Sequence, residues 1–352
     1  MTVSYQEAKL ADGDVFIGAG ALQEVSKVDS VVFDCDGTLI DVRESYDTAI
    51  ISSVASLTKG ILGEALPIDG MGARLIMETR RTGGFNSDWD TTYALTLFSA
   101  AAMNGQGARG GLERLQRVVR DFGSEERLDG WRSADDFLVR SGLESERVKE
   151  VRKRLGYPGT ARTSRLASTF DQLYYGVDLY RRIYGVDPET GYKIGLIDKE
   201  RVIVTRETLK RVSDFVGDKR LAIATGRPFI AVERTLGKLL DYFERDASVY
   251  IGDGDIYPQT AAMLSKFRKP SGESLLLAKK EFSSQALLYV GDSAEDRIMV
   301  RNAGPGGGFL FAGIYGGSAD EGEQISYFSS NGSEVIVKNV NQISSVLEMS
   351  RD

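Results

Sequence analysis

Short apolar runs that alternate with helical segments from about residue 200 onward constrain the fold of this chain more than any other feature. Residues 221–224 and 286–290 are continuously apolar, and stretches with helical spacing follow them at residues 229–243 and 295–303. Continuous apolar strands are typical of a parallel sheet that helices cover on both faces. The chain is therefore predicted to be an α/β protein with a doubly wound, Rossmann-like parallel sheet.

A long helical stretch interrupts this pattern. Residues 42–199 contain few strand-like runs, whereas residues 31–33 form a first apolar strand before them. We therefore predict an α/β core domain formed by residues 1–41 and 200–352, and a mostly α-helical domain, 42–199, inserted after the first strand. The helices expected in the insert span residues 48–62, 89–103, 111–121, 134–141 and 146–155, with a further pair of helices within 168–184.

Two acidic residues follow the first strand directly. Asp34 and Asp36 are separated only by Cys35, and Gly37 and Thr38 come next. Two carboxylates this close need a proton or a cation between them. The glycine lets the chain turn sharply while a ligand approaches the backbone. This segment is therefore predicted to be a chemical site, with Cys35 a small buried side chain on the opposite side of the strand.

Net charge and cysteine content limit the partners and the cell compartment that fit this chain. The 352 residues carry a net charge of −7, which disfavours nucleic acid or an anionic membrane as the main partner. The single cysteine excludes an intrachain disulfide and fits a reducing compartment. With no secretory signal and no long apolar run, a cytoplasmic protein is expected. Whether it is a monomer or a homodimer stays open.

The chain contains no histidine. This excludes the commonest general base, the commonest zinc ligand and every catalytic triad that depends on an imidazole. Proton transfer must therefore fall to carboxylates, lysine or tyrosine.

Polar residues stand at the ends of three predicted strands, where ligands bind in an open α/β sheet. They are Asp34 and Asp36, then Thr225 with Gly226, then Asp292 with Asp296; Lys269 precedes Pro270 between the last two strands. In order and spacing these segments resemble the four motifs of the haloacid dehalogenase superfamily, the aspartate-nucleophile phosphohydrolases. The resemblance covers residues 28–41 and about 200–315.

The resemblance implies a role for each residue. Asp34 would be the nucleophile that forms an aspartyl-phosphate, and Asp36 the general acid and base. Mg²⁺ would be held by Asp34, Asp292 and the backbone carbonyl of Asp36, with Asp296 outside the ligand set. Thr225 would hold the phosphoryl oxygens together with the following N–H groups.

Three further residue roles have alternatives. Lys269 would neutralise charge on Asp34 and the phosphate, with Lys266 as the fallback. Arg227 either reaches the substrate or pairs with an acid at the surface. In the family, an insert after the first motif is a cap that contacts the leaving group. We expect Asn86, Asp88 or Trp89 to be its contact residue; the alternative is a helix N-cap at Ser87 or Asp88.

The resulting expectation is a Mg²⁺-dependent phosphatase that acts on a small-molecule phosphate ester. A phosphosugar mutase of the same superfamily would use the same acids. A dehalogenase fits less well because it does not need Asp36, and a cation pump would need membrane segments. The alternative from another class is a non-catalytic protein that binds a phosphometabolite.

Overall fold

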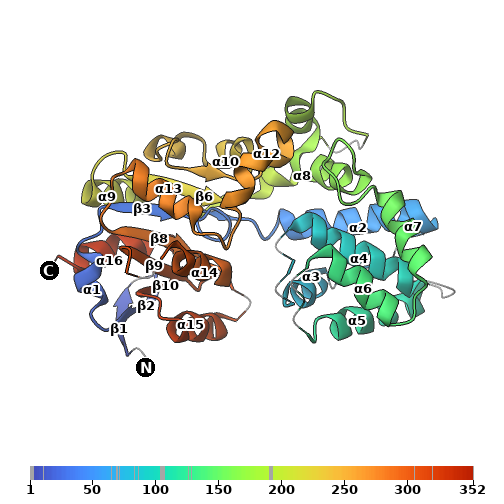
Figure 1. Cartoon of the computed structure of the whole chain (residues 1–352), viewed down its shortest axis with the longest axis horizontal. Helices are drawn as coiled ribbons and strands as arrows, with labels where there is room; N and C mark the ends of the chain where they lie inside the picture. Colours follow the sequence, from blue (N-terminus) through green and yellow to red (C-terminus); the bar gives the residue numbers. More distant parts are fainter. Residues whose placement is uncertain are drawn as a thin grey trace. The chain divides into compact units, whose positions relative to one another are not determined.

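Two units make up the chain: Met1–Val42 with Arg201–Asp352, called unit 1, and Arg43–Glu200, called unit 2. A computed structural model shows both (Figure 1). It describes residues 4–10, 12–64, 66–68, 70, 72–82, 84–85, 87–103, 108–125, 127, 129–189, 193–304, 306–318 and 320–351.

Unit 1 is built on one eight-stranded sheet, with the strand order β1-β2-β10-β9-β8-β3-β6-β7. The neighbours from β10 to β7 are parallel, whereas β2 pairs antiparallel with both β1 and β10. The predicted parallel α/β sheet is thereby confirmed. The strands are β1 (Tyr5–Leu10), β2 (Gly13–Gly18), β3 (Ser30–Phe33), β6 (Leu221–Thr225), β7 (Val249–Tyr250), β8 (Leu287–Gly291), β9 (Phe309–Ile314) and β10 (Val335–Val337).

Helices cover both faces of this sheet, as the side chains of β3 demonstrate. Val31 and Phe33 lie in one buried cluster, and Val32 lies in another. The first cluster includes side chains of α1 (Ala21–Val25), α9 (Arg206–Val216), α10 (Phe229–Leu236) and α16 (Ile343–Met349). The second includes side chains of α13 (Glu273–Glu281), α14 (Ala294–Ala303) and α15 (Glu321–Ser330).

Several elements of unit 1 differ from the sequence pattern. The helix expected over 229–243 ends at Leu236, because Gly237 has φ 50°, and a 3₁₀ helix, η3 (Gly237–Tyr242), continues the chain. The hairpin of β1 and β2 and the helix α15 were not predicted. The remaining elements are β4 (Ile40–Asp41), β5 (Arg201–Val202), α11 (Asp253–Ile256), α12 (Pro258–Leu264), η4 (Ser265–Phe267) and η5 (Val340–Gln342).

The secondary-structure elements described in unit 2 are all helices. The longest helix, α8, bends at Gly176, whose φ of 69° and ψ of 177° are not helical. A side chain there would place Cβ 2.4 Å from the Gly195 nitrogen, so the two glycines allow a close backbone contact. The helices are α2 (Tyr46–Leu62), α3 (Gly72–Arg80), α4 (Asp88–Ala102), α5 (Ala108–Phe122), α6 (Trp131–Arg140), α7 (Ser145–Leu155), α8 (Arg165–Tyr184) and η2 (Leu196–Lys199).

The hydropathy of the helices bears on membrane insertion. Across the described part of the chain, none of them combines the length and the apolar character that a membrane span requires.

Candidate active site at the carboxyl end of the sheet

Three neighbouring strands deliver the predicted polar residues to one edge of the sheet. β8, β3 and β6 run parallel and side by side. Asp34 follows the end of β3, Thr225 ends β6, and Asp292 follows the end of β8. Because parallel strands end at the same edge, these residues share one region of unit 1.

The turn after β3 fixes the first acidic pair. Gly37 has φ 73°, and its N–H donates to the Ile40 carbonyl at 2.8 Å. An added Cβ at this position would lie 2.0 Å from Oδ2 of Asp292, so only glycine fits between the turn and that carboxylate. Cys35 is fully buried and belongs to a core cluster of apolar side chains.

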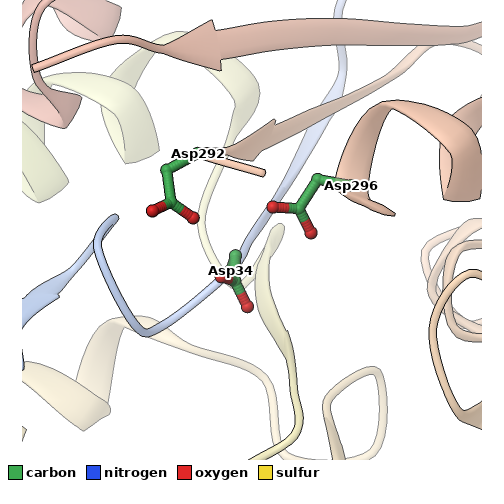
Figure 2. A group of neighbouring side chains, drawn as sticks. All are labelled: Asp34, Asp292 and Asp296. Atoms are coloured by element: carbon green, nitrogen blue, oxygen red, sulfur yellow. The ribbon is translucent and has the colours of Figure 1, made fainter. Parts of the chain in front are cut away.

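Three carboxylates converge beside this turn. Asp34, Asp292 and Asp296 each offer an oxygen, and these atoms all lie within 4.8 Å of one another. Figure 2 shows the three side chains directed toward one region, Asp34 from the turn after β3, Asp292 from the segment that joins β8 to α14, and Asp296 from the start of α14. Such a cluster of negative charge needs compensation by a cation, by protons or by both.

Lys269 supplies one positive charge to the cluster. Its Nζ lies 2.6 Å from Oδ1 of Asp34 and 2.7 Å from Oδ1 of Asp296. These three side chains are 14%, 9% and 0% exposed, so the interaction is screened little by water. Lys266 does not occupy this position; its Nζ lies over the Phe267 ring, 4.8 Å from the centroid.

Both carboxylate oxygens of Asp296 accept hydrogen bonds from protein groups. Besides Lys269, its Oδ1 accepts a hydrogen bond from the Tyr289 hydroxyl at 2.8 Å. Its Oδ2 accepts from the Ser293 nitrogen at 3.0 Å and the Ser293 hydroxyl at 2.7 Å. The Asp296 N–H in turn donates to Oγ of Ser293 at 3.2 Å, which completes the capping box of α14. The sequence analysis missed Tyr289 and Ser293. The Ser-x-x-Asp spacing could have indicated the cap, but nothing in the apolar β8 pattern singles out the tyrosine.

The protonation of the cluster follows from burial and charge. Burial raises the pKa of Asp34 from 3.8 to about 7, helped by Asp296 and Asp36 and opposed by Lys269. Burial and the charge of Asp34 raise the pKa of Asp292 well above its usual range. Burial also opposes ionisation of Asp296, but Lys269 and three hydrogen-bond donors outweigh it and lower that pKa.

The remaining carboxylate oxygens suit a hard cation. Oδ1 of Asp34 is engaged by Lys269, but Oδ2 of Asp34 and both oxygens of Asp292 accept no hydrogen bond from any described residue. Oxygen donors of this kind, buried and mutually repulsive, are those that Mg²⁺ prefers. Asp34 and Asp292 therefore fit a divalent ion, whereas the oxygens of Asp296 are already taken.

The second acid faces an arginine. Oδ1 of Asp36 lies 3.0 Å from NH1 of Arg227, whose side chain is only 1% exposed. Arg227 is therefore not the surface residue that one of the sequence interpretations required. Thr225 is buried and its Oγ1 accepts from the Arg227 N–H at 3.2 Å, while no atom lies within 4 Å of an added Cβ at Gly226.

The residues predicted in the insert belong to unit 2. Asp88 is the first residue of α4 and forms an ion pair with Arg80 at 2.5 Å. Ser87 caps this helix, as the alternative interpretation proposed, and Trp89 donates its Nε1–H to Asp171 at 3.2 Å. Asn86 lies outside the described residues.

One family model and several solved structures match the chain. The family model for the haloacid dehalogenase-like hydrolases matches residues 28–304. A comparison with curated proteins found no match.

Two solved structures match about nine tenths of the chain. The phosphatase Tt82 from Thermococcus thioreducens is 25% identical, with a TM-score of 0.52, and the match covers 90% of this chain and 98% of that one. An X-ray structure from a structural genomics consortium is 17% identical, with a TM-score of 0.56 and coverages of 91% and 98%. The latter likeness concerns the fold alone.

Proposed function

Because the chain belongs to the haloacid dehalogenase-like hydrolases, we propose that it hydrolyses a small-molecule phosphomonoester through an aspartyl-phosphate on Asp34. One observation carries this proposal. The carboxylate of Asp34 is buried at the strand end, is held by Lys269 at 2.6 Å and lies beside Asp292 in a cluster that fits a cation. A scaffold protein has no need for such a costly arrangement of charge.

Two steps complete the reaction. A carboxylate oxygen of Asp34 forms a bond to phosphorus as the ester oxygen leaves, and Asp36 gives the leaving oxygen its proton. Water then attacks phosphorus, Asp36 takes a proton from it, and the bond between Asp34 and phosphorus breaks to release inorganic phosphate. Two carboxylates two residues apart thus perform the roles that histidine cannot perform here.

Lys269 and Thr225 assist the transfer by position. Lys269 favours the ionised form of Asp34, against the effect of burial, and offsets charge that develops on the phosphoryl group. Asp296 holds Lys269, since both of its oxygens are engaged by protein donors. Thr225 and the N–H groups after it would bind phosphoryl oxygens, and the open space at Gly226 leaves room for them.

Mg²⁺ is the cofactor that the donor set favours. Asp34, Asp292 and the backbone carbonyl of Asp36 would hold it. When bound, it neutralises the carboxylates and the phosphate and so lets two anions meet.

One similar protein supports hydrolysis. The Thermococcus thioreducens protein, 25% identical over nearly its whole length, is described as a phosphatase. A phosphosugar mutase would use the same acids but return the phosphoryl group to a sugar, so analysis of the products distinguishes the two.

Substrate selection is proposed to reside in unit 2. This unit follows the first motif and precedes the second, the place at which the insert interrupts the core. We assign a selective role to the segment at the start of α4, with Asn86 and Asp88 as its polar members. Asn86→Ala and Asp88→Ala should alter kcat/KM unequally across a panel of phosphate esters, and identical ratios for every ester would remove this assignment.

The test of the proposal is hydrolysis of 4-nitrophenyl phosphate, with and without Mg²⁺, by the native chain and Asp34→Asn. Asp29→Asn is the matched control, because Asp29 precedes β3 at its opposite end. We expect Mg²⁺-dependent turnover in the native chain and the control, and none in Asp34→Asn. Turnover that survives in Asp34→Asn contradicts the mechanism. No turnover of any ester in a panel of aryl, sugar and nucleoside phosphates would instead favour a binding role.

A further inference from the structure

A buried arginine next to the second acid is the feature that the mechanism above does not use. The Arg227 side chain is 1% exposed, and its NH1 lies 3.0 Å from Oδ1 of Asp36. A guanidinium cannot lose its proton in a protein, so burying it is costly unless an anion pairs with it. Arg227 is therefore committed to the region around Asp36.

The backbone at Arg227 is fixed from several directions. Its N–H donates to Oγ1 of Thr225, and the N–H of Phe229, at the start of α10, donates to Oδ1 of Asp253 at 2.7 Å. A Cβ added at Gly252 would lie 2.5 Å from the Pro228 nitrogen, so the end of β7 packs directly against this backbone. The arginine side chain thus extends from a segment with little freedom to move.

The backbone at Asp36 is equally constrained, and its carboxylate forms the ion pair with Arg227. The tight turn at Gly37 and the hydrogen bonds from Leu39 and Ile40 to the Cys35 carbonyl fix the main chain. The Asp36 side chain is 34% exposed, and the last torsion of an aspartate is intrinsically broad. An ion pair to a fixed guanidinium restricts that torsion.

We infer that Arg227 is a positioning residue, which holds the Asp36 carboxyl group in the orientation needed to transfer a proton to and from the substrate oxygen. This inference rests on the proposed function, and it differs from both alternatives of the sequence analysis, in which Arg227 either reaches the substrate or pairs with an acid at the surface. Orientation matters here because proton transfer requires hydrogen-bond distance, and a displacement of about 1 Å can cost on the order of 10²-fold in rate.

The acidity of the leaving group separates this role from other roles. The kcat/KM of a phosphatase reports the first phosphoryl transfer. An ester with an acidic leaving group, 4-nitrophenyl phosphate, needs no protonation in that step, whereas phenyl phosphate needs it more. A residue that acts only through Asp36 must therefore affect phenyl phosphate more strongly. A residue that binds the phosphoryl group must affect both esters equally.

The variant for this test is Arg227→Met, and the chain offers a matched control. Arg220 donates to the Asp29 carbonyl at 3.0 Å, and the pair joins the beginnings of β6 and β3. Arg227 and Asp36 join the same two strands at their other ends. Arg220→Met removes an arginine of the same type from the far edge of the same sheet, and it should leave both kcat/KM values close to native.

We expect Arg227→Met to lower kcat/KM for phenyl phosphate by about 10²-fold and that for 4-nitrophenyl phosphate by only about two-fold. The kcat of both esters should fall, because Asp36 also activates water in the shared second step. In an Asp36→Asn background the same substitution should have almost no further effect. An equal loss of kcat/KM for both esters, no loss, or full additivity with Asp36→Asn would overturn the inference.

A second variant covers the outcome in which Arg227→Met does not fold. Arg227→Lys keeps the charge but loses the planar fork. It should give a smaller loss of kcat/KM with the same preference for the phenyl ester, and an equal loss for both esters would overturn the inference. Failure of the proposed function is recognised separately, as turnover that survives in Asp34→Asn.

Discussion

Removal of the Lys269 ammonium group is the perturbation whose cost can best be worked from the structure. Lys269 contacts Asp34 at 2.6 Å and Asp296 at 2.7 Å, and the carboxylates are 9% and 0% exposed. Exposed ion pairs contribute at most about 1 kcal/mol, but loss of one partner of a buried pair costs about 3–5 kcal/mol. The second range applies here, because Lys269→Met leaves buried negative charge without its partner.

Urea denaturation of metal-free protein at pH 8 measures this cost. Lys269→Met should lower the free energy of unfolding by about 3–5 kcal/mol. The matched control is Lys266→Met, which removes a lysine that lies over the Phe267 ring at 4.8 Å and should cost about 0.5–1 kcal/mol.

The effect of Lys269→Met should also depend on pH. Burial raises the pKa of Asp34 to about 7 even with the lysine present, and without it the pKa rises further. At pH 5.5 the carboxyl group therefore keeps its proton in the folded state, and the loss of stability should be smaller than at pH 8. A change within about 0.5 kcal/mol at both pH values would refute the reasoning, since that is the size of a surface substitution.

Three further predictions concern the same cluster. Gly37→Ala should lower the free energy of unfolding by about 1–2 kcal/mol because of its positive φ, as urea denaturation measures. It should also weaken Mg²⁺ binding, measured by calorimetry, by about 10–100-fold because the added Cβ displaces Asp292. Gly63→Ala, with a similar φ but no atom near the added Cβ, should show only the loss of stability. Burial raises the pKa of Asp34 from 3.8 to about 7, so in metal-free protein the stability that its protonated form contributes is lost as pH rises through this range. Mg²⁺ compensates the ionised carboxylate, so it should raise the melting temperature more at pH 8 than at pH 5. Tyr289→Phe, which removes a 2.8 Å hydrogen bond to a buried carboxylate, should cost about 1.5–3 kcal/mol and lower kcat more than it changes KM; unchanged unfolding and kcat would argue against a supporting role.

The sequence predicts the centre of the sheet because its strands are buried on both faces. β3, β6 and β8 are buried at every position and are mostly apolar. Polar residues at the ends of such strands lose solvation, so they indicate a functional site. By contrast, β1 alternates polar and half-buried residues and carries Gln6, Glu7 and Lys9, so its pairing depends on β2 rather than on its own pattern.

Parts of the site depend on contacts that no local pattern encodes. Arg227 resembles a surface residue in the sequence, because arginine is rarely fully buried, and no local pattern indicates that its side chain is 1% exposed and paired with Asp36. Tyr289 is one more aromatic residue in an apolar strand until Asp296 meets its hydroxyl. The choice between Lys266 and Lys269 likewise depends on where the end of η4 directs each side chain.

The central claim, that Asp34 carries the phosphoryl group, is tested most directly by trapping. Turnover of 4-nitrophenyl phosphate with Mg²⁺ is stopped with acid, and the peptides are mapped by mass spectrometry. A phosphoryl group on Asp34, absent without Mg²⁺ and absent from Asp34→Asn, is the predicted result. A phosphoryl group on another residue, or steady turnover of Asp34→Asn in the same experiment, would contradict the account.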